Sequence, residues 1–495
     1  MSILTDHQHP NCHNLKVLID ASLRFNYVLH CENEKALAAM QFFLLNLVSA
    51  SSCYVEPVMV IISRTISKIE LDKCEKVHEH FHRILQQLLV MYPRCAALMA
   101  RTIKSNYPHH VRPVAEIQAY SRFLLQITTY MQNHVHRNRL IDLFIEKIAT
   151  VDVHIPSEKT LQETSKGADE GKEVEVNSID PMLQKMDVLI EEACKFLTHA
   201  SKTMNPVLFT HTIVTFVQAY KMTVLPVQRI RFAPFVVLFA ACCAGTNSVE
   251  WLIENLRECF FDETYSKSTR ILFIQHSAAL ICRTRCYADQ GVVHWLSSLV
   301  SWLHSYLDFA DLRKREKRLR ADVDRHLLFY GALSAVMRVV HFRRDALRSQ
   351  FASAADVIAR MRVNRLLRSR LNPLRILPAA LTKKFVTVIG EEGNIHLDEV
   401  YQRSMRQSVP DRTCFNRPNH LAVKFPLEDP AFPSFDTYFK SVYRECPETL
   451  CTVGDEEKSR TLPTMPSPTA IYGHDNLTKK GGMQMNDNWS ALDLH

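Results

Sequence analysis

Apolar residues at helical spacing constrain this chain more than any other feature of its sequence. In the stretch EKVHEHFHRILQQLLVMY they recur every three or four residues, and the pattern returns around Ile117 and Leu140. This spacing places apolar side chains on one face of an amphipathic helix. No run of alternating apolar and polar residues indicates a strand, so the sequence predicts an all-α fold. The first face comprises Val77, Phe81, Ile84, Leu85, Leu88 and Leu89.

The predicted helices come in pairs. We expect hairpins at roughly 35–68, 75–105 and 115–150, with starts about 40 residues apart, inside the ~40–47-residue period of HEAT and armadillo repeats. Each pair is apolar on one side and must bury that side against its neighbour. The sequence therefore predicts a HEAT-repeat-like solenoid, with N-terminal hairpin repeats over 1–153 and C-terminal helical repeats over 181–390.

Three segments depart from this helical pattern. Residues 154–180 are acidic, polar and almost free of large apolar groups, so we expect a disordered insertion there. The proline-containing residues 391–445 predict extended segments packed on the solenoid. Residues 446–495 are polar and rich in proline, which predicts a disordered tail.

Glycine is scarce, which argues against nucleotide-dependent chemistry. The 495 residues include 11 glycines, none before Gly167. The usual share of glycine in a protein sequence is ~7%. Phosphate-cradling loops need glycine where the backbone approaches the ligand, and no GxGxxG, GxxxxGK[ST] or GxSxG occurs. The sequence therefore argues against nucleotide-dependent chemistry and α/β-hydrolase catalysis and leaves an enzyme unsupported, and we expect no cofactor and no small-molecule substrate.

Histidine and cysteine spacings do not predict a metal site. In VHEHFH only His78 and His82 share a helix face, and no partner set with ligand spacing accompanies them, so a solvated helix flank is favoured. The same absence of a second pair favours buried or semi-buried thiols for Cys282 and Cys286. Cys242, beside Cys243, is expected to be a small core residue.

The compartment is predicted from thiol usage and hydropathy. The 14 cysteines are scattered and the N-terminal stretch lacks an apolar core of signal length, which indicates reduced thiols in a cytosolic or nuclear protein. The longest apolar run, FAPFVVLFAACCA at 232–244, is too short to span a bilayer, so no membrane association is expected.

Basic residues concentrate between 312 and 384, where 19 Lys and Arg face 5 Asp and Glu. Such an excess is typical of a surface that binds acidic partners or nucleic acid, and arginine suits phosphate or carboxylate recognition. The alternative is a solvated helix end. The stretch RKREKRLR is a candidate nuclear localisation signal comprising Arg313, Lys314, Arg315, Lys317, Arg318 and Arg320. The candidate binding arginines are Arg343, Arg344, Arg360, Arg362, Arg365, Arg368, Arg370 and Arg375.

Three stretches, taken in order, carry a resemblance to a known family. They are FLLNLVSASSCYV at 43–55, SRLNPLRILPAALTKKF at 369–385, and FPLEDP followed by SFDTYFKS at 425–441. The chain resembles the RNA polymerase I-specific transcription initiation factors, called TIF-IA in mammals, over roughly residues 12–442. LIDLFIEKIATVDV before the acidic insertion and WLHSYL at 302–307 are similar too.

The resemblance implies a HEAT-repeat adaptor without catalytic activity. Such factors bind RNA polymerase I at its stalk and dock region and bridge it to the promoter-bound selectivity or core factor on ribosomal DNA, in the nucleus and nucleolus. The resemblance assigns polymerase binding to Ser49, Ser51 and Ser52, whose alternative role is helix capping. Further phosphorylation candidates are Ser467, which precedes a proline, and Ser441, which precedes a valine and so would escape proline-directed kinases.

Two other functions stay open on sequence grounds. A general nuclear HEAT-type scaffold or transport protein would share the solenoid but not the association with RNA polymerase I. A helical nucleic-acid-binding protein would use the basic region at 312–384 and bind bare DNA with a steep dependence on salt.

Overall fold

A computed structural model describes residues 12–24, 33–68, 74–156, 180–227, 230–312, 321–350, 360–393, 397–406, 425–428 and 432–445. Within these ranges helix follows helix, and the sole β contact is an isolated bridge between Thr284 and Tyr443. The all-α prediction is therefore confirmed. Among these same residues, every helix is too short or too polar to cross a membrane.

The three predicted hairpins are present. After α1 (Cys12–Leu23), α2 (Glu34–Ala50) pairs with α3 (Val55–Ile66), α4 (Cys74–Met91) with α5 (Ala96–Asn106), and α6 (Val114–Tyr130) with α7 (His134–His154). A short 3₁₀ turn joins the two helices within each of the first two pairs: η3 at Ser52–Tyr54 and η5 at Pro93–Cys95. The predicted apolar face of α4 is buried: Val77, Phe81 and Leu88 are each 0% exposed.

Helices resume after the insertion, and their start positions follow local chemistry. Asp180 and Asn205 cap α9 and α10 by accepting from the N–H groups of Met182 and Val207, and each helix has a proline in its first turn. The helices are α9 (Pro181–Thr203), α10 (Pro206–Ala219), the π-turn η6 (Tyr220–Val224), α11 (Ala233–Cys243), α12 (Thr246–Phe261), α13 (Lys267–Arg283), α14 (Asp289–Leu312), α15 (Leu327–Phe342), α16 (Arg344–Gln350), α18 (Val363–Leu367), α19 (Pro373–Ile376), α20 (Ala379–Gly393), α21 (Asp398–Arg406) and α22 (Phe435–Tyr438).

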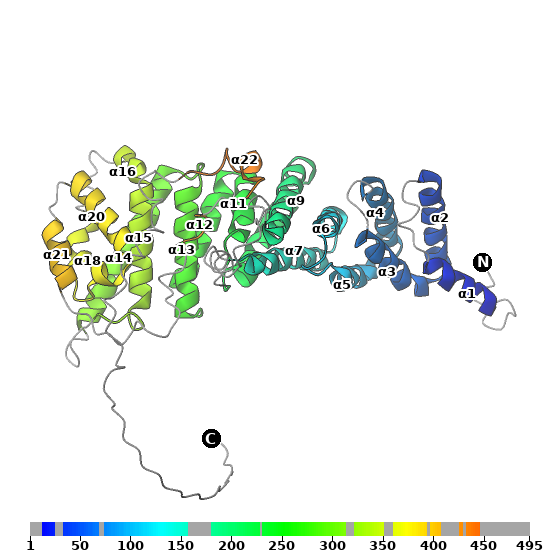
Figure 1. The fold of residues 1–495 in the computed structure, drawn as a ribbon, viewed down its shortest axis with the longest axis horizontal. Helices are drawn as coiled ribbons and strands as arrows, with labels where there is room; N and C mark the ends of the chain where they lie inside the picture. The colour runs from blue at the N-terminus through cyan, green and yellow to red at the C-terminus, as the bar shows by residue number, and fades with distance from the viewer. Residues whose placement is uncertain are drawn as a thin grey trace, which may run out of the picture. The chain divides into compact units, whose positions relative to one another are not determined.

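The helices stack in the order in which the chain makes them. Helix α2 contacts α4, α3 contacts α5, α6 contacts α9, and α13 packs between α12 and α15. Figure 1 shows the same succession in the colour sequence from α1 to α21. The packing of α13 against α15 uses Gly331, because a Cβ there would lie 2.9 Å from the Ile271 side chain.

A buried carboxylate joins the helices on either side of the acidic insertion. Asp152, near the end of α7, is 1% exposed, and its Oδ2 accepts from the N–H groups of Phe232 (2.8 Å) and Ala233 (2.7 Å) at the start of α11. Burial raises the pKa of this carboxyl, while these N–H groups and Arg231 favour its charged form. The insertion itself, at 157–179, lies outside the described residues.

The range 391–445, expected to be extended, contains helix among its described residues. Leu397 and Ser404 are buried at a spacing of seven, which is the helical spacing that α21 adopts. Residues 432–445, here called the C-terminal strap, form the short helix α22 and pack on α11 (Figure 1). The predicted tail from 446 onward lies outside the described residues.

Aromatic side chains hold the C-terminal strap in place. Phe235 of α11 lies 5.2 Å from Phe432, 6.0 Å from Phe435 and 5.5 Å from Phe439, measured between ring centroids. The strap also reaches α9, where the Ser434 N–H donates to Asp187 Oδ1 at 2.8 Å. Residues near the C-terminus of the described chain thus complete the core of its middle repeats.

Candidate functional site

The serine cluster lies where the first complete hairpin turns. Ser49 is in the last turn of α2, Ser51 ends that helix with φ −156° and ψ 128°, and Ser52 begins η3. The backbone closes the turn, because the Ser51 N–H donates to Leu47 O at 3.1 Å. The Ser51 side chain makes no capping bond to η3 and instead lies 3.1 Å from Cys53 Sγ. Capping therefore does not account for the Ser51 hydroxyl.

An apolar side chain accompanies these hydroxyls on the surface. Ser49 and Ser52 are exposed and Ser51 is half-buried. Phe42 is 72% exposed and lies seven residues before Ser49, which puts both on one face of α2. An exposed large aromatic beside small hydroxyls is typical of a protein-binding surface. We call Phe42, Ser49, Ser51 and Ser52 the serine-turn surface.

Arg343 does not belong to any surface, which corrects its assignment as a binding residue. Its side chain is 1% exposed and lies between α13 and α14. The guanidinium donates to Ile281 O at 3.0 Å, to Tyr287 O at 3.1 Å and to Asp289 Oδ1 at 2.8 Å. Its five donors make it a link between neighbouring helices.

Most of the remaining candidate arginines are accessible. Arg344 and Arg365 are half-buried, and Arg365 is paired with Asp308 of α14, whose pKa the hydrogen bond from Arg365 lowers. Arg375 also donates to Met405 O at 3.3 Å. The exposed members are Arg360, Arg362, Arg368, Arg370 and Arg375.

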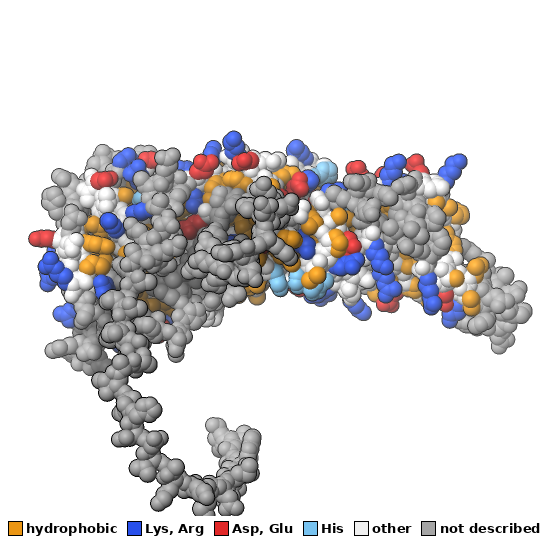
Figure 2. Space-filling model, in the orientation of Figure 1, with side chains coloured by type: hydrophobic (Ala, Val, Ile, Leu, Met, Phe, Trp, Pro, Cys, Tyr) orange, Lys and Arg blue, Asp and Glu red, His pale blue; other side chains and the backbone are white. Residues whose placement is uncertain are grey.

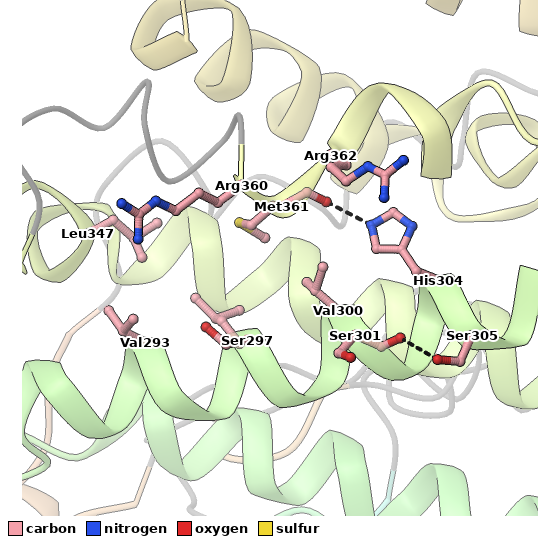
Figure 3. Close-up of a pocket in the computed structure, with 11 residues that line it drawn as sticks. Val293, Ser297, Val300, Ser301, His304, Ser305, Leu347, Arg360, Met361 and Arg362 are labelled. Carbon is pink, nitrogen blue, oxygen red and sulfur yellow. Dashed lines mark hydrogen bonds between the residues drawn. The ribbon is translucent and has the colours of Figure 1, made fainter.

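A cavity of about 390 Å³ lies between α14 and the chain entering α18. Arg360 and Arg362 stand on either side of Met361 along one wall, and Ser297 and Ser301 line the facing helix (Figure 3). We call this the arginine pocket. Its lining combines cationic and hydroxyl groups, a set that suits carboxylate or phosphate oxygens.

His304 makes two polar contacts inside the arginine pocket, one through each ring nitrogen. Its Nε2 lies 2.9 Å from Met361 O, so this nitrogen carries the proton and donates (Figure 3). Nδ1 is then an acceptor and faces Arg365 Nη1 at 3.5 Å.

On the face shown in Figure 2, Lys and Arg side chains are spread along the described helices among acidic ones, so charge alone does not single out one region there.

The buried histidines correct another expectation. His78 and His82, expected on a solvated flank, are each 3% exposed, and the ring centroids of His82 and Phe123 lie 4.5 Å apart. Burial lowers the pKa of each to about 3. Among the described residues, no group of three or more His, Cys, Asp or Glu side chains could hold a metal ion.

The sequence did not predict the groove between α6 and α9. It has a volume of about 530 Å³, and its lining includes Arg122, Glu192 and Lys195 beside apolar side chains such as Leu125 and Phe196. Glu192 is buried and accepts from Arg122 Nη2 at 2.7 Å and from Gln118 Nε2 at 2.9 Å. Arg122 and Glu192 are 70 residues apart in the sequence, so no local pattern could predict this ion pair. The carboxylate is fully partnered, so it acts as a link between hairpins.

Two sets of candidates fall outside the described residues. They are the localisation signal, Arg313 to Arg320, and the phosphorylation candidate Ser467. Ser441 is described and is exposed in the C-terminal strap.

Comparison with known proteins decides the family. The model of the RNA polymerase I specific transcription initiation factor RRN3 family matches residues 11–439. The chain belongs to the RRN3 family. An RRN3-family factor of mouse is 23% identical over 417 residues, covering 74% of this chain and 62% of the relative. One of Schizosaccharomyces pombe is 21% identical, covering 80% and 69%.

The fold comparison agrees with RRN3 membership. The crystal structure of RNA polymerase I transcription initiation factor Rrn3 matches with a TM-score of 0.72 and 18% identity, over 90% of this chain and 88% of that one. The chain thus spans about three-fifths of the length of the mouse RRN3 relative, but almost all of the solved Rrn3 fold.

Proposed function

We propose that the protein is a non-catalytic adaptor that binds RNA polymerase I and bridges it to the promoter-bound selectivity or core factor. Membership of a polymerase I-specific initiation factor family carries this proposal. The polymerase's stalk and dock region is the proposed contact. Transcription of ribosomal RNA genes is the outcome, and the nucleolus within the nucleus is its place.

The serine-turn surface is the proposed polymerase contact. Phe42 offers apolar area, and the small side chains of Ser49 and Ser52 let a partner approach closely. A phosphate on either serine would add up to ~2 negative charges to a close-fitting interface. Modification there would weaken the contact while leaving the buried face of the hairpin untouched.

The arginine pocket and the exposed arginines near it are the proposed contact for the promoter-bound partner. Arg360, Arg362, Arg368 and Arg370 are exposed and present planar cations to acidic side chains or DNA phosphates. They belong to the α14–α18 region, many helices along the stack from α2 and α3. This separation along the stack would let two partners bind at once.

Affinity purification followed by mass spectrometry tests the proposal. Recovery of RNA polymerase I subunits with the tagged protein is expected. Recovery of transport cargo or unrelated complexes without those subunits would instead favour a general nuclear scaffold.

Variants then separate the two contacts. Replacing Ser49, Ser51 and Ser52 together with Asp, or Phe42→Ala alone, should reduce polymerase recovery while Ser201→Asp, an exposed serine on α9, should not. Replacing Arg360, Arg368 and Arg370 with Glu should preserve polymerase binding and lower occupancy on ribosomal DNA. Equal polymerase recovery from the serine variant and from Ser201→Asp would argue against the serine-turn assignment.

A further inference from the structure

Two thiols far apart in sequence meet at the end of α11. Cys242 Sγ and Cys286 Sγ are 3.9 Å apart, joining the last turn of α11 to the loop between α13 and α14. Both cysteines are free, and Cys286 is exposed while Cys242 is half-buried. The sulfurs of a disulfide lie ~2.05 Å apart, so this pair must approach by about 1.9 Å to bond.

The two thiols differ in reactivity. The sulfur–sulfur contact with Cys242 lowers the pKa of Cys286 to about 7, and the same contact together with burial raises the pKa of Cys242. Cys286 is therefore the more acidic and the more exposed of the two thiols, and the thiolate is the reactive form. Cys282, one turn earlier on α13, is 0% exposed, and burial raises its pKa to about 12.

Both cysteines lie on the elements against which the C-terminal strap packs. Cys242 is on α11, whose Phe235 and Phe239 contact the strap's aromatic rings. Cys286 follows Arg285, whose backbone N–H donates to Val442 O at 2.9 Å and whose Nε donates to Tyr443 O at 2.7 Å. One of the two thiols therefore lies on each of two elements that the C-terminal strap contacts.

We propose that Cys242 and Cys286 form a peroxide-sensitive dithiol whose oxidation cross-links the two elements that seat the C-terminal strap. The Cys286 thiolate attacks hydrogen peroxide, so an S–O bond forms, the O–O bond breaks and hydroxide leaves to become water. Cys242 then attacks the sulfenic sulfur, so the S–S bond forms, the S–O bond breaks and a second water is released. Two thiols are oxidised by two electrons while one peroxide is reduced.

Peptide mapping of the reduced full-length protein after hydrogen peroxide treatment tests the bond. Cross-linked tryptic peptides containing Cys242 and Cys286 are expected, with loss of two hydrogens that a thiol reductant restores. Cys243→Ser is the matched control, because Cys243 neighbours Cys242 in the same tryptic peptide, and it should keep the cross-link. Cys242→Ser should abolish it and leave Cys286 as a sulfenic acid that dimedone labels.

Hydrogen exchange tests the consequence for the strap. Exchange in peptides from 432–445 should slow after oxidation of the wild-type protein and of Cys243→Ser, but not of Cys242→Ser or Cys286→Ser. A cross-link that survives Cys242→Ser, no cross-link at all, or unchanged strap exchange in a fully cross-linked sample would each overturn the proposal.

Discussion

Several polar side chains are buried between the helices, and the apolar spacing of the sequence does not predict their burial. His78, His82 and His276 are at most 8% exposed, and burial lowers the pKa of each to about 3. Arg343 looks like its exposed neighbours in the sequence but bonds to two backbone carbonyls. Sequence alone could not separate the two cases, because burial depends on which helix packs over each position.

The buried histidines predict acid sensitivity. Their folded pKa lies below the unfolded value of 6.5, so below pH 6.5 the unfolded chain binds protons that the folded protein excludes, and stability falls. At pH 5 we expect a loss of about 2 kcal/mol per histidine. Urea denaturation between pH 7.5 and 5 measures it. His78→Leu should flatten the decline and His211→Gln, at an exposed position, should not; a profile level down to pH 5 would contradict the burial.

The burial of Arg343 leads to a second prediction at the residue scale. Arg343→Met leaves Ile281 O and Tyr287 O without their guanidinium donor and should cost about 3 kcal/mol of unfolding free energy. Arg344→Ala, at the adjoining half-buried position, should cost less than about 1 kcal/mol. Urea midpoints of the two variants compare them directly. Equal midpoints would mean that Arg343 belongs to the surface after all.

At the scale of elements, the hairpins could be predicted from spacing, but the C-terminal strap's packing could not. The three pairs between α2 and α7 follow from apolar periodicity and breaks at proline. The contact of Phe439 with Phe235 joins positions about 200 residues apart, and no local pattern encodes such a partner. The serine turn was recognisable as a motif, whereas the exposure of Phe42 on the same face emerged only from packing.

The strap's anchor can be tested by one substitution. Phe439 is 0% exposed against Phe235 and Phe239, so Phe439→Ala should destabilise the protein by about 3–5 kcal/mol. It should also speed tryptic cleavage after Lys440, which is exposed. Thr437→Ala, in the same turn but exposed, serves as the control. Identical cleavage rates for the two variants would show that the aromatic cluster does not hold the strap.

At the scale of the whole molecule, the stacked hairpins offer long side-chain surfaces along the described helices. The described helices place the serine-turn surface on α2 and η3 and the arginine pocket between α14 and α18. The arginines were predicted from their local charge excess and the serines from the family resemblance, and both assignments stay predictions; the buried Arg343 was wrongly included. The two proposed contacts lie on separate parts of one stack, an arrangement that would suit a bridge between two partners.

Recruitment of purified RNA polymerase I to ribosomal promoter DNA loaded with its selectivity or core factor tests the bridging most directly. Polymerase should be retained only when the protein is added. Both the triple serine-to-aspartate variant and the variant with Glu at Arg360, Arg368 and Arg370 should fail, the first by losing polymerase and the second by losing the promoter complex. Equal retention without the protein would contradict the adaptor account, whereas retention with either variant would contradict only the contact assigned to that variant's residues.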